Sequence, residues 1–162
     1  MLKPNITEII KLVVSIVTCQ LAGFIGSLFT TPSIPTWYAT IKKPSFTPPN
    51  AVFGPVWTML FLLMGISAYL IWRKGLQDKN VKWALMIFIV QLVLNVLWSI
   101  LFFGLHHPFL AFIEIIVLWL VILATLISFM KLSKPAGILL LPYLIWVAFA
   151  AILNYQLWKL NS

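Results

Sequence analysis

One long apolar stretch, FLAFIEIIVLWLVILATLISFM, runs from Phe109 to Met130. It contains one charged residue, Glu114, and it is as long as the roughly 20 apolar residues that a helix needs to cross a bilayer. Hydrocarbon offers no hydrogen bonds, so the backbone there has to satisfy its own, and a helix does this within one segment. The stretch therefore predicts a transmembrane α-helix.

Four further runs of similar length and composition accompany this segment. They are Ile9 to Phe29, Val52 to Trp72, Trp83 to Leu105 and Ala136 to Trp158. None of the runs alternates apolar and polar residues with the period of two that marks the strands of a membrane barrel. We therefore expect an all-α, integral membrane bundle of five transmembrane helices, forming a single domain over residues 1–162.

The composition agrees with a membrane protein. Hydrophobic residues make up 62% of the chain and charged residues 9%, whereas soluble domains carry about 25% charged residues. The net charge of +8 comes from Lys and Arg at the ends of the apolar runs, where they anchor helices, and does not indicate nucleic-acid binding. The single cysteine, Cys19, excludes an internal disulfide. The first run is long enough to span, so we expect a retained helix and not a signal peptide.

The connection over residues 30–50 is longer than the others and holds five of the ten prolines. Proline fixes φ and restricts the residue before it, so this loop should be stiff. Because it also carries Trp37, Tyr38 and Phe46, we expect it to pack onto the bundle as a lid.

The distribution of positive charge predicts the orientation. The side with the N-terminus and the second and fourth connections holds Lys3, Arg73, Lys74, Lys79, Lys82, Lys131 and Lys134, whereas the other side holds Lys42, Lys43 and Lys159. Positively charged loops stay in the cytoplasm. In a bacterial cell membrane the N-terminus should therefore be cytoplasmic.

Two stripes of residues at helical spacing could wall a cavity. The third run carries Gln91, Asn95, Trp98, Ser99 and Phe102, and the fifth carries Pro142, Trp146, Ala150 and Asn154. Either stripe has an alternative role, in which its polar groups only join helices to one another. Pro142 should also break a backbone hydrogen bond and bend its helix there. Trp57, one turn into the second run, belongs either to the cavity or to the interfacial belt.

Three other features carry weaker signals. Glu114 is either a functional intramembrane acid or a structural carboxylate at the interface, and the structural role is favoured. His106 and His107 have no accompanying ligand set, so we expect no metal site. The ladder Ser15, Cys19, Gly23 and Ser27 suits close helix packing, within the bundle or in a homodimer.

The usual arrangements for catalysis are absent from the sequence. It has no phosphate-binding loop, no nucleophile with a plausible base, and only three acidic residues, which argues against hydrolytic catalysis. A cavity rich in aromatic residues and poor in charge instead suits a flat, hydrophobic ligand.

Four motifs give the chain a resemblance to a known family. They are WYATIKKPSFTPP (37–49), VFGPVWT (52–58), NVLWSILFF (95–103) and LLLPYLIWVAFAAILN (139–154). In this order and spacing they resemble the translocator protein family, also called TspO/MBR, tryptophan-rich sensory protein or peripheral benzodiazepine receptor. Phe46 departs from this pattern, because the family usually has Trp at that place.

The resemblance implies a five-helix bundle, often a homodimer, with a ligand cavity beneath the first loop. The family's ligands are porphyrins, notably protoporphyrin IX, sterols such as cholesterol, and synthetic benzodiazepine-type compounds. By motif position, the ligand-binding residues would be Tyr38, Pro44, Trp57, Asn95, Trp98, Ser99, Trp146 and Ala150. Leu153, Tyr155 and Lys159 fit a permissive sterol-contact pattern that carries little weight.

Three functions are therefore open. The leading one is a membrane receptor or sensor for a porphyrin, with no other cofactor required and no nucleic-acid partner. The second is light-dependent degradation of protoporphyrin IX, as the resemblance implies for some members, with Trp57 and Trp146 as the photochemical residues. The third is a porphyrin or sterol transporter, although the sequence shows no inverted repeat of the kind many transporters have.

Overall fold

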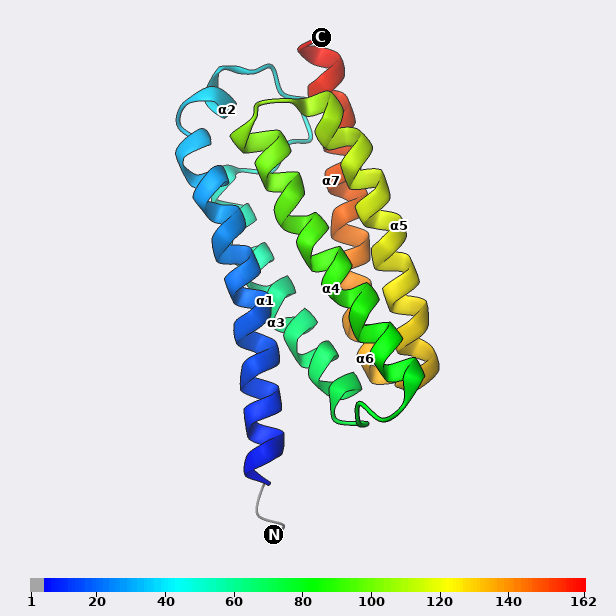
Figure 1. Cartoon of the computed structure of the whole chain (residues 1–162). Helices are drawn as coiled ribbons and strands as arrows, with labels where there is room; N and C mark the ends of the chain where they lie inside the picture. Colours follow the sequence, from blue (N-terminus) through cyan, green and yellow to red (C-terminus); the bar gives the residue numbers. More distant parts are fainter. Residues whose placement is uncertain (1–4) are drawn as a thin grey trace.

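The computed structural model describes residues 5–162, which form helices and turns and contain no strand. Figure 1 shows the long helices side by side in one bundle. The long helices are α1 (Ile6–Ser33), α3 (Asn50–Trp72), α4 (Lys79–Ser99), α5 (Pro108–Leu132) and α7 (Leu141–Leu160). The short elements are α2 (Trp37–Thr40), the π-helical turn η1 (Ile100–Gly104) and α6 (Lys134–Leu139). Within this part of the chain, five helical spans are long and apolar enough to cross a membrane, which confirms the predicted all-α fold.

All five spans begin before the apolar run that predicted them, and polar side chains cap the starts of α1 and α4. The side chain of Asn5 accepts the N–H of Thr7 at the start of α1, and that of Asp78 accepts the N–H of Asn80 at the start of α4. Such caps satisfy backbone donors that the first turn leaves unpaired. The first turn of α4 contains mostly polar residues. The helix therefore begins at Lys79, four residues before the start at Trp83 that hydropathy alone predicted.

The loop predicted over residues 30–50 is shorter than expected. Helix α1 continues through Pro32 to Ser33, and α2 lies within the remaining segment. Pro32 has no N–H to donate to the carbonyl of Leu28, so this end of α1 lacks one helical hydrogen bond. The hydroxyl of Thr36 then donates to the carbonyl of Pro32 at 2.8 Å and helps to close this helix end.

The fifth span is interrupted at Leu140, between α6 and α7, two residues before the predicted bend at Pro142. Pro142 lies in the first turn of α7, where its missing N–H leaves no carbonyl unpaired. The interruption therefore precedes the proline that was expected to cause it.

The two halves of the bundle differ in packing. In the half that contains the N-terminus, a Cβ on Gly65 of α3 would lie 2.6 Å from Cα of Ile16, so α1 and α3 touch there. The hydroxyl of Ser67 donates to the carbonyl of Ala136 at 2.7 Å and joins α3 to α6. The opposite half carries α2 and the C-terminus (Figure 1) and contains a cavity.

The small-residue ladder of α1 packs within the bundle. Ser15 and Cys19 are buried in the single chain, and a Cβ on Gly23 would lie 2.6 Å from the ring of Phe61. Close packing, the first of its two predicted roles, is therefore confirmed for these three residues, whereas Ser27 lines the cavity. A homodimer stays a prediction.

A candidate ligand cavity beneath the lid

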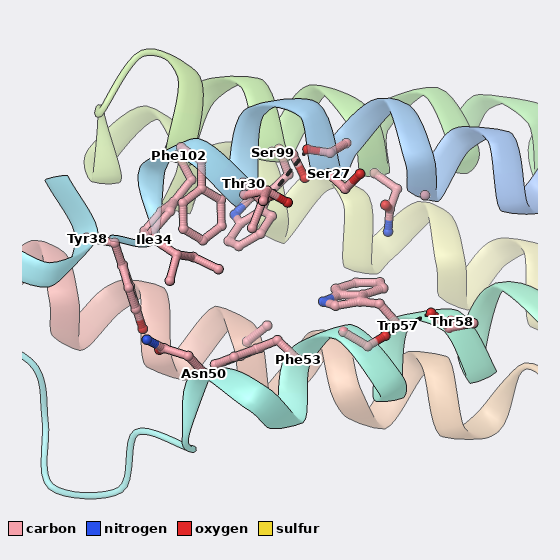
Figure 2. Close-up of a pocket in the computed structure, with 18 of the residues that line it drawn as sticks. Ser27, Thr30, Ile34, Tyr38, Asn50, Phe53, Trp57, Thr58, Ser99 and Phe102 are labelled. Atoms are coloured by element: carbon pink, nitrogen blue, oxygen red, sulfur yellow. Dashed lines mark hydrogen bonds between the residues drawn. The ribbon is translucent and has the colours of Figure 1, made fainter. Parts of the chain in front are cut away.

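A cavity of about 530 Å³ lies between the helices under the loop of residues 34–49, which we call the lid. None of the residues that line it is charged. Its aromatic lining residues are Phe24, Tyr38, Phe53, Trp57, Phe61, Trp98, Phe102, Phe103 and Trp146. Its polar ones are Gln20, Ser27, Thr30, Thr31, Asn50, Thr58, Asn95, Ser99 and Asn154. Figure 2 shows side chains of α1 and α3 facing one another across this space.

The structure brings together most of the residues that the sequence assigned to the site. Tyr38, Trp57, Asn95, Trp98, Ser99, Trp146 and Ala150 all line the cavity. Pro44 does not line it. Its carbonyl accepts the N–H and the hydroxyl of Thr47, at 3.1 and 2.8 Å, so Pro44 shapes a turn within the lid.

Aromatic contacts hold the indole rings of the cavity wall. Trp98 stacks on Phe102 with ring centroids 5.2 Å apart and an interplanar angle of 19°. Trp146 meets Phe53 edge to face, with centroids 6.1 Å apart. Because such pairs prefer defined geometries, the cavity wall is largely preformed.

The lid is fastened to the bundle at one end by stacked rings. Trp37 of α2 stacks on His106, with centroids 4.5 Å apart and an interplanar angle of 14°, and it meets Phe102 at 5.5 Å. His106 follows η1 with φ at +52°, a left-handed conformation that turns the chain back towards the lid. His107 has a different role, since its Nδ1 accepts the N–H of Leu110 at the start of α5.

Tyr38 closes the cavity under the lid. Only 4% of its surface is exposed, and its burial raises the pKa of the phenol above the ordinary value. The ammonium of Lys43 lies 4.6 Å from the centre of the Tyr38 ring. The positive charge of Lys43 therefore lies against the Tyr38 ring, on the lid side of the uncharged cavity.

Comparisons with known proteins show the family of this chain. The profile described as the TspO/MBR family matches residues 15–159. The chain belongs to the TspO/MBR family. It is 48% identical to "Tryptophan-rich protein TspO" of Archaeoglobus fulgidus, over 96% of this chain and 99% of that protein. It is 38% identical to "Translocator protein" of Homo sapiens, over 88% of this chain and 85% of that one. The "Tryptophan-rich sensory protein" of Cereibacter sphaeroides is 37% identical, over 77% of each chain.

In this TspO/MBR chain, Trp98 serves both of the predicted roles at once. Its ring lines the cavity, but its indole N–H donates to Oδ1 of Asn154 at 3.0 Å. The Nδ2 of Asn154 donates in turn to the carbonyl of Pro108 at 2.8 Å. The indole donor of Trp98 is therefore used to join α4, α7 and α5, and the ring offers a ligand its apolar face.

A second hydrogen-bonded group lies deeper in the bundle. Asn95 donates to the hydroxyl of Tyr143 at 2.9 Å, and that hydroxyl donates to Oε1 of Gln91 at 2.8 Å. Gln91 is buried and does not line the cavity, so its hydrogen bond to Tyr143 joins α4 to α7, whereas Asn95 also lines the cavity. Within residues 5–162 no hydrogen bond involves Oδ1 of Asn95, which leaves one acceptor for a ligand.

Sequence reasoning missed the contribution of α1. Gln20, Gly23, Ser27, Thr30 and Thr31 all line the cavity. Their spacings of three and four residues place them on one helix face, so the periodicity that revealed the other stripes was present here too. Phe53 was also missed, although it lies four residues before Trp57 on the same face of α3.

Glu114 lies apart from the cavity. It is 8% exposed, and neither of its carboxylate oxygens has a hydrogen-bond partner among the described residues. Uncompensated charge is costly in such surroundings. This burial does not fit the predicted structural carboxylate at the interface. The alternative, a functional intramembrane acid, stays a prediction.

Proposed function

We propose that this TspO/MBR protein is a membrane receptor or sensor that binds a porphyrin such as protoporphyrin IX in the cavity beneath the lid. The observation that carries the proposal is an uncharged cavity of about 530 Å³ bordered by three indole rings. Small-molecule sites commonly measure 300–1,000 Å³ and are mostly apolar, with a few placed polar groups. In this proposal, sterols or benzodiazepine-type compounds bind in the same cavity and compete there with the porphyrin.

The chemistry of the lining suits a flat macrocycle with an acidic edge. The faces of Trp57, Trp98 and Trp146 offer stacking, and Oδ1 of Asn95 offers an acceptor. A porphyrin's propionates need a cation, and Lys43 on the lid is the one that stands behind Tyr38. In this proposal the macrocycle lies among the indoles and its propionates point towards the lid.

A titration tests this proposal. Protoporphyrin IX should quench the tryptophan fluorescence of the purified protein, and Trp146→Ala or Trp57→Ala should raise Kd at least about tenfold, which corresponds to 1.4 kcal/mol. The matched control is Trp83→Ala, because Trp83 is 61% exposed and does not line the cavity. Wild-type affinity in both cavity variants would remove the proposed site.

Light-dependent degradation of the porphyrin is a second candidate, favoured by one observation. The rings of Trp57 and Trp146 both border the cavity, so a bound porphyrin would lie against them. An indole π system in contact with an excited porphyrin can donate an electron to it. Illumination in oxygen should then yield a new absorbing species that Trp57→Phe abolishes, and an equal bleaching rate in that variant would argue against this function.

We further propose a bacterial cell membrane with the N-terminus in the cytoplasm. Arg73, Lys74 and Lys79 lie at the connection between α3 and α4, on the same end of the bundle as the N-terminus (Figure 1). Lys3 of this predicted set lies outside the described residues. A membrane-impermeant thiol reagent should label Gln77→Cys only after the membrane is opened. Labelling of intact cells would reverse the orientation.

A further inference from the structure

The cavity is open on one side only. Its exposed lining residues all belong to α1 and α3, and they are Phe24, Thr31, Asn50, Ala51, Gly54 and Thr58. The lining residues from α2, α4, η1 and α7 are buried or half-buried. The mouth of the cavity therefore lies between α1 and α3, and we call this opening the lateral slot.

The lower end of the slot is defined by contacts between the two helices. The side chain of Gln20 donates to the carbonyl of Thr58 at 3.1 Å, and the Phe61 ring lies against Gly23. Beyond these contacts, a Cβ built on Gly54 would meet no atom within 4 Å. From Asn50 to Thr58 the slot extends about 12 Å along α3, at 1.5 Å per residue. Figure 2 shows Thr30 of α1 and Phe53 of α3 on opposite sides of the space that it enters.

The end of the cavity that faces water is closed. Tyr38 of the lid is 4% exposed, and Phe102 beneath it is 1% exposed. The lid is held by the stack of Trp37 on His106, and at its other end the backbone of Lys42 makes two hydrogen bonds with Asn161. A solute in water would have to break these contacts to enter, whereas a solute in the bilayer meets an opening.

We propose that the ligand reaches the cavity from the bilayer leaflet on the lid side, through the lateral slot. This inference rests on the proposed function. It assigns the ligand to the class of flat amphiphiles that dissolve in the membrane, with a polar edge near the headgroups. Gln20, Thr31, Asn50 and Thr58 supply polar groups along the slot, where a helix that only faces lipid would be apolar.

Entry rates in proteoliposomes test the route. Gly54→Leu fills open space, so the rates of protoporphyrin IX association and dissociation should both fall at least about tenfold. Met59→Phe is the control, since Met59 is 56% exposed on α3 and does not line the cavity. Asn161→Ala, which loosens the lid, should leave the rates unchanged. Normal rates in Gly54→Leu together with faster rates in Asn161→Ala would overturn the proposal in favour of entry through the lid.

A second measurement needs no porphyrin. Phosphatidylcholine with brominated acyl chains should quench the fluorescence of Trp57 through the slot, seen as the difference between the wild type and Trp57→Phe. Gly54→Leu should remove most of that difference. Failure of protoporphyrin IX to bind the wild type would refute the proposed function alone. Absence of bromolipid quenching at Trp57 would refute the slot, whichever ligand the cavity holds.

Discussion

The side chain of Asn161 pairs with the backbone of Lys42 across 119 residues of sequence. Its Oδ1 accepts the N–H of Lys42, and its Nδ2 donates to the carbonyl of Lys42, both at 2.9 Å. An amide side chain thus satisfies both backbone groups of one lid residue. Because Asn161 directly follows α7, the lid is fixed to the last helix of the bundle.

Asn161→Ala should loosen the lid without unfolding the bundle. Both hydrogen bonds are exposed, and each is expected to contribute about 1 kcal/mol or less. The amide of Lys42 should exchange its hydrogen faster, as measured by hydrogen–deuterium exchange and mass spectrometry. Asn161→Asp keeps the acceptor and should show a smaller effect. Unchanged exchange in both variants would mean that Trp37 and His106 hold the lid alone.

Tyr143→Phe should destabilise the bundle. The variant lacks the hydroxyl that accepts from Asn95 and donates to Gln91, and it leaves two buried amides short of a partner. An unsatisfied buried group costs about 1–3 kcal/mol. Thermal unfolding in detergent should show a lower midpoint. Tyr155→Phe is the control, since Tyr155 is 37% exposed, and an equal effect of the two substitutions would contradict the prediction.

Two glycines of α3 should respond oppositely to alanine. A Cβ on Gly65 would lie 2.6 Å from Cα of Ile16, so the helices have to separate, at a cost of about 1–3 kcal/mol. Gly54→Ala adds a methyl to open space and should leave stability equal or slightly higher, since alanine favours helix. Thermal unfolding of the two variants measures the contrast. Equal midpoints would show that α1 and α3 do not touch at Gly65.

Glu114→Gln should be tolerated. The carboxyl group is buried without a partner, so a neutral amide of the same size removes the cost of an isolated charge. We expect an unfolding midpoint equal to or above that of the wild type and an unchanged porphyrin titration, since Glu114 does not line the cavity. A large loss of stability would instead indicate a specific role for the carboxylate.

The sequence predicted the features that depend on neighbouring residues. Long apolar runs predict spans because the length of a helix in lipid follows from bilayer thickness. The stripe of Trp146, Ala150 and Asn154 was predicted because residues four apart share a helix face, and the structure places all three at the cavity.

The individual contacts between distant segments could not be predicted. The pairing of Lys42 with Asn161 and the stack of Trp37 on His106 join residues whose local sequences carry no sign of one another. The lateral slot depends on how far α1 and α3 separate, which hydropathy does not report. The N-cap residues Asn5 and Asp78 can be recognised in the sequence, but the predicted helix boundaries were placed from hydropathy alone.

The π-helical turn η1 makes the shape of the cavity wall sensitive to the number of residues in that turn. The N–H of Leu105 bonds to the carbonyl of Ile100 at 2.7 Å, five residues back, so the turn holds one residue more than an α-helical turn would. Phe102 and Phe103 both reach the cavity from this widened turn. Deleting one residue between Ile100 and Gly104 would restore the α-helical pitch and rotate one of these rings away. Inserting or deleting one residue at this turn would therefore change which aromatic rings line the cavity, even with every other side chain kept.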